Sequence, residues 1–505
     1  MSQHRLETSG RKMDRAQITR RGVLTAAVGI TVATGLAGFG LRPKRELLGL
    51  PAIEAYNSSL VSTGKIKSFD LSARLTQVDL GGTLAQTWTY GDLLPGKIIR
   101  VNKGDRVKIA FNNELPVPTS VHWHGLAIRN DMDGVPGVTT PEVPPGRSFN
   151  FDFITPDAGT HWFHPHSGTQ LDRGLYAPFI VDDPAEKTQY QREWILILDD
   201  WSDGVGKNPD EILAELMEGD GTGMGGMDMG GMGMGGMGMG GMDGGDVTYP
   251  MYLINGRPSN DPEIFRAKPG ERIRLRIINA AADTIFDCAL AQHTMEVTHT
   301  DGYPVKPLKT ALLQIGMGER YDVIVKLKDG VFPLVAQAVG KSAMVRALIR
   351  TGSGRAPQAN FKPSELNAIP LSAQSLEATD EVRLPAKRPD RIQNLVLTGS
   401  MNPYVWKING RTYADTEPLT IGLNETGRLR IRNMSMMPHP MHLHGHTFQL
   451  GSAGSSGARK DTVLVPPMAQ FDVDFAATNP GQWMIHCHNA YHAEAGMMTR
   501  LDYSA

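Results

Sequence analysis

A dense group of metal-binding side chains lies near the C-terminal end of the chain. His486, Cys487 and His488 are consecutive, and His492 and Met497 follow closely. Two imidazoles, a thiolate and a weak thioether form the ligand set of a blue-copper electron-transfer site. Successive side chains of a strand point to opposite faces. If this segment is extended, Cys487 faces one metal centre while its two histidine neighbours face another.

The pattern His-x-His occurs three more times, within the segments HWHG, HWFHPH and HPMHLHG. On a strand, residues i and i+2 point to the same side, so both imidazoles of a pair point together. A single pair is usually two ordinary histidines. Four pairs, one of them enclosing a cysteine, predict several metal ions held at an interface between two domains. The eight histidines of these pairs are His122, His124, His164, His166, His442, His444, His486 and His488, and the same segments also contain His439 and His492.

A weak internal repeat indicates the elements that position these histidines. Segments beginning at Gly104, Gly270 and Gly427 alternate polar with apolar residues after a glycine turn. This period of two is typical of half-buried strands. The repeat predicts an all-β protein of three homologous β-sandwich domains, with boundaries near residues 185 and 370. Each copy ends near an asparagine, at Asn112, Asn279 and Asn433.

The histidine pairs fall only in the first and third of these units. In the second unit the corresponding segment, from Gly330, reads GVFPL and contains no histidine. We therefore expect the metal ligands in residues 43–185 and 371–505. The unit formed by residues 186–370 is interpreted as a spacer or scaffold without metal ligands.

The N-terminus carries a twin-arginine export pattern. Residues 19–24 read TRRGVL, and residues 23–41 carry no charge. This stretch is rich in Gly, Ala and Thr, as is typical of an export signal. The alternative is an uncleaved membrane anchor, because an uncharged stretch of this length can nearly span a bilayer. We expect residues 1–42 to be a leader. The mature protein is then periplasmic, in the cell envelope or extracellular, without stable membrane association.

Residues 217–246 form a low-complexity insert in which methionines are embedded in glycine. Such a segment cannot bury enough apolar surface to fold by itself. A plain loop fits this composition. Thioethers also prefer soft monovalent copper, so we expect the stretch from Met224 to Met242 to recruit Cu(I) and bind additional copper.

Charge and cysteine content limit the remaining possibilities. The chain has 51 basic and 53 acidic residues, which gives no electrostatic basis for binding nucleic acid or an anionic membrane. Its two cysteines are Cys288 and Cys487. A copper-bound Cys487 cannot be part of a disulfide, so we expect none. Cys288 lies in an apolar run and is expected to be a buried strand residue.

The four histidine segments, in this order, resemble the copper motifs of the multicopper oxidases, the family of laccases, ascorbate oxidase and bacterial copper-resistance oxidases. The resemblance extends from about residue 75 to residue 505. It implies cupredoxin-like Greek-key domains and four copper ions, one of type 1, one of type 2 and two of type 3. The implied type 1 ligands are His439, Cys487, His492 and axial Met497. The implied type 2 ligands are His122 and His442, and the implied type 3 ligands are His124, His164, His166, His444, His486 and His488.

The resemblance also implies catalytic roles. Cys487 passes electrons from the type 1 copper to its histidine neighbours, and dioxygen is reduced to water. This reduction consumes protons. Asp133 matches an acid near the type 2 copper, although a plain turn residue also fits. Glu494 is the second candidate acid, because Ala493 stands where many bacterial relatives have Glu; a surface charge is its alternative. Asp461 is expected either to support the type 1 loop or to be exposed.

These observations predict an exported multicopper oxidase that oxidises Cu(I), and phenols or aromatic amines less selectively, in copper tolerance. Two alternatives stay open. One is a general laccase whose methionine insert is incidental, and the other is a copper-sequestering protein without turnover. A copper nitrite reductase is disfavoured, because it needs only one histidine-rich catalytic centre.

Overall fold

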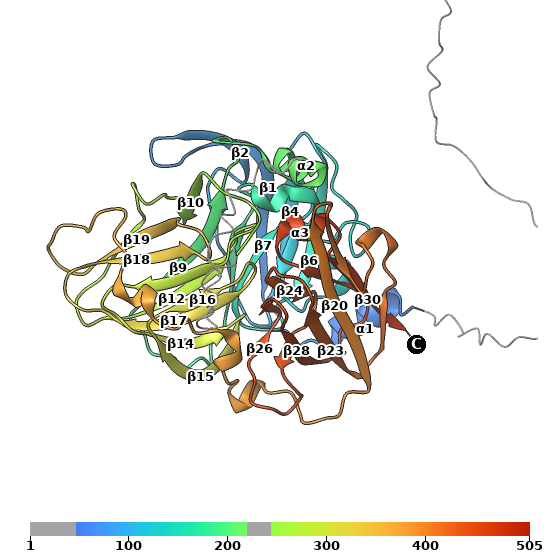
Figure 1. The fold of residues 1–505 in the computed structure, drawn as a ribbon. Helices are drawn as coiled ribbons and strands as arrows, with labels where there is room; N and C mark the ends of the chain where they lie inside the picture. Colours follow the sequence, from blue (N-terminus) through green and yellow to red (C-terminus); the bar gives the residue numbers. More distant parts are fainter. Residues whose placement is uncertain (1–46, 220–243, 505) are drawn as a thin grey trace, which may run out of the picture. The chain divides into compact units, whose positions relative to one another are not determined.

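Three β-sandwiches make up the part of the chain that the computed structural model describes, residues 47–219 and 244–504 (Figure 1). The first contains β1 (Ile66–Asp79), β2 (Leu84–Tyr90), β3 (Ile99–Asn102), β4 (Arg106–Asn113), β5 (His122–His124), β6 (Ser148–Ile154), β7 (Gly159–His164) and β8 (Ala177–Asp182). These strands form two sheets, in the orders β2-β1-β4-β6 and β3-β8-β7-β5.

The second sandwich contains no member of a His-x-His pair. Its strands are β9 (Arg192–Trp201), β10 (Met251–Ile254), β11 (Ile264–Arg266), β12 (Arg272–Asn279), β13 (Phe286–Leu290), β14 (Met295–Thr300), β15 (Tyr303–Thr310), β16 (Leu313–Ile315), β17 (Arg320–Lys326), β18 (Val331–Ala338) and β19 (Met344–Arg350). They form one sheet in the order β10-β9-β12-β17-β14-β15 and another in the order β11-β19-β18-β13-β16.

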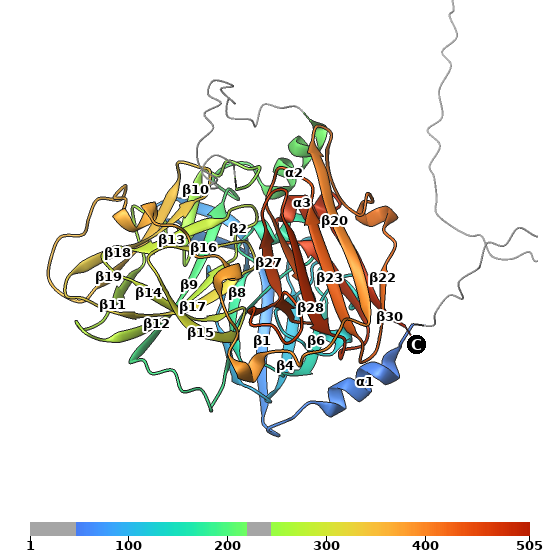
Figure 2. The same cartoon turned by 60° about the horizontal axis from the view of Figure 1, so that its bottom comes forward.

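The third sandwich has the same plan. Its strands are β20 (Arg391–Met401), β21 (Tyr404–Ile408), β22 (Leu419–Gly422), β23 (Thr426–Asn433), β24 (His439–Leu443), β25 (Phe448–Leu450), β26 (Arg459–Lys460), β27 (Thr462–Val465), β28 (Gln470–Ala476), β29 (Gln482–Cys487) and β30 (Met498–Ser504). The sheet orders are β21-β20-β23-β28-β25-β26 and β22-β30-β29-β24-β27. In both views the third sandwich (orange to red) lies beside the first (blue to cyan) (Figure 2).

Helices contribute little to the described residues. They are α1 (Leu50–Ser59), α2 (Pro209–Glu218) and α3 (Ala490–Glu494), with six 3-10 turns, η1 (Asn130–Met132), η2 (Gly168–Asp172), η3 (Ser364–Asn367), η4 (Ala373–Ser375), η5 (Asp380–Val382) and η6 (Tyr413–Asp415). Within this part of the chain, no helix has both the length and the apolar character needed to cross a bilayer. The predicted leader and the methionines from Met224 to Met242 lie outside the described residues.

The sequence repeat corresponds to one strand that is repeated in all three sandwiches. Strands β4, β12 and β23 each run parallel to one neighbour and antiparallel to another. The prediction of three homologous β-sandwiches is confirmed. The predicted half-burial holds for β4, where buried and more exposed positions alternate, but not for β12. Only the first residue of β12 is exposed, because both faces of this strand are covered.

The third copy of the repeat begins earlier than the sequence suggested. Gly104 and Gly270 precede their strands with φ of 82° and 83°, and the equivalent residue is Asn424, with φ of 66°. All three donate their backbone N–H to the matching neighbouring strand, at Thr155, Leu327 and Ala477. Asparagine tolerates this left-handed conformation better than most residues. The predicted start at Gly427 is therefore wrong, because Gly427 lies inside β23.

The asparagine at the end of each repeat fixes the loop that follows. The side-chain amides of Asn113, Asn279 and Asn433 each donate to one backbone carbonyl within that loop and to another on a segment 30 to 36 residues further along the chain. The first of these is Asn113, whereas the sequence pattern predicted Asn112. In the first and third sandwiches the loop leads into the strand that carries a histidine pair, so the repeat directly positions the candidate metal ligands.

Candidate metal centre

One thiol and two imidazoles converge where β24, β29 and α3 meet. The Cys487 Sγ lies 3.6 Å from His439 Nδ1 and 3.7 Å from His492 Nδ1, and the two nitrogens are 3.1 Å apart. All three side chains are buried, as is Met497, whose carbonyl accepts the backbone N–H of Cys487. We call His439, Cys487 and His492 the cysteine site. Its trigonal N₂S donor set, with a methionine beside it, suits copper.

The outer ring nitrogens of the cysteine site bind protein oxygens. His439 Nε2 lies 2.7 Å from the Ser435 hydroxyl, and His492 Nε2 lies 2.9 Å from the Asp246 carboxylate, which also accepts from Tyr404. Burial lowers the pKa of His492, but the Asp246 carboxylate outweighs burial and raises this pKa to about 10. Both imidazoles are thereby oriented with Nδ1 toward Cys487.

Strand alternation directs the other histidine pairs toward the interface between the first and third sandwiches. Trp123 points into the core of the first sandwich, where it packs against Phe151 and Phe163. His122 and His124 on either side of it point the opposite way. Burial of this indole holds β5 in place, and thus fixes both imidazoles.

Eight imidazoles gather at this interface, and we call them the histidine cluster. His124 Nδ1 lies 3.2 Å from His488 Nε2, while His486 Nε2 lies 3.3 Å from His166 Nε2 and 3.0 Å from His444 Nε2. Cys487 thus has one flanking histidine in each of two groups, a division that the sequence did not predict. The members of the histidine cluster are His122, His124, His164, His166, His442, His444, His486 and His488.

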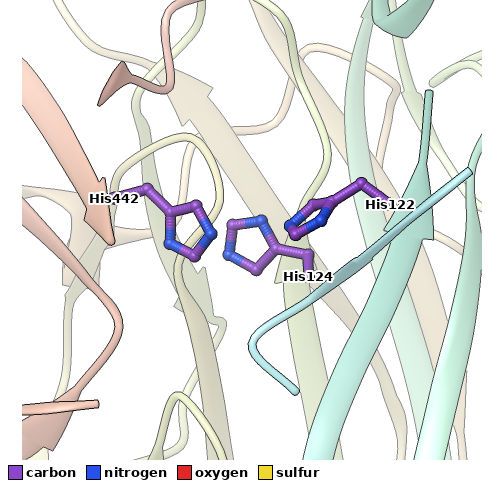
Figure 3. Close-up of side chains that lie close together, drawn as sticks. All are labelled: His122, His124 and His442. Carbon is purple, nitrogen blue, oxygen red and sulfur yellow. The ribbon is translucent and has the colours of Figure 1, made fainter. Parts of the chain in front are cut away.

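A third group joins both sandwiches within the histidine cluster. His122 and His124 come from one ribbon and His442 from another, and their rings lie close together (Figure 3). The rings of His124 and His442 stack with centroids 3.9 Å apart. The Nε2 atoms of His122, His442 and His164 are buried and have no hydrogen-bond partner in the protein.

The imidazoles of the histidine cluster are neutral and present lone pairs to one another, which suits the binding of cations. In six rings the nitrogen that faces away from the neighbouring imidazoles contacts a protein oxygen. That contact places the N–H outward and leaves a lone pair facing inward. Burial, together with neighbouring imidazoles, lowers the pKa of the rings well below the usual value in His124, His164, His166, His444, His486 and His488. Neutral imidazoles whose lone pairs converge at 3.0–3.3 Å fit bound metal ions.

Asp133 joins two members of the histidine cluster. Its carbonyl lies 2.8 Å from His122 Nδ1, and its carboxylate lies 3.0 Å from His444 Nδ1. The turn approaches β5 so closely that a Cβ on Gly134 would lie 1.7 Å from the Val121 carbonyl. Only glycine fits there, and the close approach of the turn places Asp133 against the imidazoles. These contacts go beyond what a turn residue needs, so Asp133 is not merely a turn residue.

Asp461 lies beside the histidine cluster and not beside the cysteine site, contrary to both expectations for it. Its side chain is fully buried. The carboxylate lies 3.2 Å from His124 Nε2, and the carbonyl lies 3.0 Å from His442 Nδ1. The Arg320 guanidinium of the second sandwich holds both carboxylate oxygens, at 2.7 and 2.6 Å. Burial alone raises the pKa of Asp461, but Arg320 outweighs it and holds this pKa well below its usual range.

Glu494 lines a small cavity of about 30 Å³ beside the histidine cluster. This volume accommodates one or two molecules of the size of water. Burial, together with the nearby Asp210, raises the pKa of Glu494. The side chain is partly buried, so both the role of an acid and that of a partly exposed charge remain compatible with its position. The cavity is also lined by Ala493, and by His164, His166, His486 and His488.

A buried cysteine site joined through one strand to a cluster of imidazoles defines a copper-dependent electron-transfer enzyme. Family models described as multicopper oxidase match residues 73–186, 194–354 and 384–505. The chain is 47% identical to multicopper oxidase MmcO of Mycobacterium tuberculosis, over 99% of each chain. It is 27% identical to a copper resistance protein A homolog of Pseudomonas syringae pv. tomato, covering 95% of this chain and 98% of that one.

The fold agrees with these comparisons. The crystal structure of Fet3p, a multicopper oxidase that functions in iron import, has a TM-score of 0.74 at 22% identity, covering 87% of this chain and 90% of that one. The chain belongs to the multicopper oxidase family. It is an oxygen-using oxidoreductase with copper cofactors and cupredoxin-like β-sandwiches.

Several contacts of these sites were not predicted from the sequence. No sequence motif includes Asp246, Ser435 or Arg320. In the folded protein, Asp246 contacts His492, Ser435 contacts His439, and Arg320 contacts Asp461. Only Ser435, four residues before His439, lies near enough in the sequence for a local argument. Cys288 is buried and reduced, as expected, and both cysteines are free.

Proposed function

We propose that this multicopper oxidase oxidises Cu(I) in copper tolerance, with phenols and aromatic amines as less selective donors. The supporting observation is that three exposed methionines are chain neighbours of residues that support the cysteine site. Met434 and Met436 flank Ser435, which binds His439, and their side chains are 39% and 64% exposed. Met468, 60% exposed, is next to Ala469, whose carbonyl accepts the N–H of Asn433. Exposed thioethers at this position suit a soft monovalent ion.

A carboxylate approaches the same site from the methionine-rich insert. Asp246 is among the last residues of that insert and contacts the outer nitrogen of His492. A cuprous ion held near Asp246 or near Ser435 would thus be separated from Cys487 by a single imidazole, that of His492 or His439. We further propose that the stretch from Met224 to Met242 binds additional copper.

We assign the copper ligands as the family resemblance implies. The type 1 copper would be held by the cysteine site together with Met497, the type 2 copper by His122 and His442, and the type 3 pair by the other six members of the histidine cluster. This assignment gives four copper ions. The domain boundaries proposed near residues 185 and 370 place the ligands in the first and third domains, residues 43–185 and 371–505.

Bound copper supplies the one-electron chemistry and the reduction of dioxygen to water. The protein residues provide the path and the protons. Cys487 lies at the end of β29 between His486 and His488, so its backbone is the shortest covalent link between the two sites. Glu494 has a raised pKa and lines the cavity beside the histidine cluster, so it can hold a proton there. Asp133 orients His122 and His444 and is the second candidate for proton transfer.

We further propose that residues 1–42 direct twin-arginine export. The mature protein then acts in the periplasm, the cell envelope or the extracellular space, without stable membrane association. This placement suits an enzyme that acts on copper before it enters the cell.

The proposed specificity is tested by deleting residues 221–243 and measuring steady-state oxygen consumption with Cu(I) and with a simple phenol. The deletion retains Gly244 to Asp246, so the contact with His492 is kept. We expect a higher KM for Cu(I) and an unchanged rate with the phenol. Unchanged kinetics with Cu(I) would favour a general laccase, and the absence of oxygen uptake with either donor would favour a copper-sequestering protein.

A further inference from the structure

Asp283, a residue of the second sandwich, holds together two chain segments that support His492 of the cysteine site. Its carboxylate is fully buried. One oxygen accepts from the Asn489 side-chain amide at 2.6 Å and from the Asp246 backbone N–H at 3.0 Å. The other accepts from the Val247 backbone N–H at 2.9 Å and from Lys341 at 3.3 Å. Four donors thus converge on one carboxylate.

Both segments held by Asp283 lead directly to His492. The Asn489 Oδ1 atom accepts the backbone N–H groups of Tyr491 and His492, and thereby caps the N-terminus of α3. The other segment presents the Asp246 carboxylate to His492 Nε2. Asp283 therefore controls both the backbone that carries this imidazole and the carboxylate that binds its outer nitrogen.

The backbone around Asp283 is shaped for this contact. A Cβ on Gly245 would lie 1.9 Å from the Asp283 carbonyl and 2.2 Å from its carboxylate, so only glycine allows the approach. The backbone N–H of Asp283 and that of Ala282 are in turn held by the two oxygens of Asp200. The Ala282 carbonyl accepts the N–H of Ala490, which ties α3 to the same loop. The contact is therefore built from several elements and is not a single surface hydrogen bond.

An amide cannot replace this carboxylate. Asp283→Asn would point an NH₂ group either at Asn489 and Asp246 or at Val247 and Lys341. In both orientations two buried donors lose their acceptor, which destabilises this arrangement. The segment that carries Asp246 is then no longer fixed against His492.

We propose that Asp283 is a positioning residue for the cysteine site: it fixes Asp246 on His492 and so sets the reduction potential of the copper bound there. This proposal rests on the assignment of His492 as a type 1 ligand. A carboxylate that accepts the N–H of a ligating imidazole makes that imidazole a stronger donor, which favours the oxidised metal ion. Loss of the contact therefore raises the potential. The second sandwich thus takes part in tuning a metal site to which it contributes no ligand.

The test compares copper-loaded full-length Asp283→Asn, Asp246→Asn and the double variant by redox titration, visible absorption and electron paramagnetic resonance. Asp287→Asn is the matched control, since Asp287 is a largely buried carboxylate of β13 that bonds Gln314 and contacts neither site. We expect Asp283→Asn to change the oxidised-to-reduced ratio at a fixed potential about tenfold, which is about 59 mV for one electron. The shift has the same sign as in Asp246→Asn, and the double variant shows no further shift.

Two results would overturn the proposal. One is a potential and spectrum of Asp283→Asn equal to those of Asp287→Asn, whatever the loss of thermal stability. The other is an additive shift in the double variant, which would mean that Asp283 does not act through Asp246. If the amide variant does not load copper, Asp283→Glu replaces it, because the glutamate keeps the charge beside Lys341. This variant should shift the potential less than Asp283→Asn, with the same sign. An unchanged potential counts against the proposal. None of these readouts depends on Cu(I) oxidation, so failure of the proposed substrate leaves them unaffected.

Discussion

Replacing Asp461 by asparagine tests how the second sandwich supports the histidine cluster. Asp461 and Arg320 are both fully buried, and the guanidinium contacts both carboxylate oxygens. An amide retains one of these contacts and turns an N–H toward the other guanidinium nitrogen. It also removes the charge that opposes Arg320, leaving Asp301 at 3.5 Å as the nearest acid. His124 Nε2 then loses the carboxylate that orients it.

The magnitude follows from burial and from the contact with a candidate ligand. Removing one member of a buried ion pair costs about 3–5 kcal/mol. An unfolding entropy of about 2.1 cal/mol/K per residue corresponds to about 1 °C per kcal/mol for this chain, so the unfolding midpoint falls by about 3–5 °C. Loss of a group that orients a metal ligand lowers metal affinity or activity about 10–100-fold. Asp461→Asn should therefore lose both stability and oxygen uptake per bound copper.

Asp322→Asn is the matched control for this variant. Asp322 is equally buried and is held by Arg274 and Arg276, but it contacts no candidate ligand. Differential scanning calorimetry, copper analysis and oxygen consumption are measured on both. We expect similar losses of stability, with activity per copper retained only in Asp322→Asn. Equal activity in the two variants would refute the role given to Asp461.

Three further outcomes are expected. Glu494→Gln should lower steady-state oxygen uptake about 100-fold, since an amide cannot supply a proton; an unchanged rate between pH 5 and 8 would exclude Glu494 as the donor. Met436→Leu should raise the KM for Cu(I) roughly tenfold, equivalent to about 1.4 kcal/mol of lost thioether binding, without affecting phenol turnover; an equal effect on both donors would contradict the soft-metal role. Burial raises the pKa of Asp322, but Arg274 and Arg276 outweigh it and hold the pKa well below its usual range. The stability that Asp322 contributes is therefore fully present above about pH 4 and is lost progressively as the pH falls toward the depressed pKa. The gap in unfolding midpoint between parent and Asp322→Asn should therefore begin to narrow below about pH 4; a constant gap from pH 7 to pH 3 would contradict this.

The sequence was sufficient to predict the strands that carry the histidine pairs, because their pattern is local. Alternation on a strand puts Trp123 in the core and its histidine neighbours at the interface, as observed. The same alternation separates Cys487 from His486 and His488. The β-sandwich repeat was also readable, since a half-buried strand imposes a period of two.

The register of the third repeat and the supporting contacts were not readable in this way. Asn424 takes a left-handed conformation that the sequence pattern assigned to a glycine. Asp246 and His492 are 246 residues apart, and Asp461 lies 141 residues from Arg320. Such pairs depend on how the sandwiches pack, which no short motif encodes. The interpretation of the second unit as a spacer is therefore incomplete, because Arg320 and Asp283 both come from it.

The central claim is that electrons from the cysteine site pass through Cys487 to the histidine cluster, where dioxygen is reduced. It is tested most directly by copper analysis and oxygen consumption of Cys487→Ser, with Cu(I) and a phenol as donors. The serine removes the thiolate but leaves His486 and His488 in place. We predict copper retained in the histidine cluster, loss of the blue absorption and no oxygen uptake with either donor. Oxygen uptake near the parental rate in a variant without the blue absorption would contradict the account.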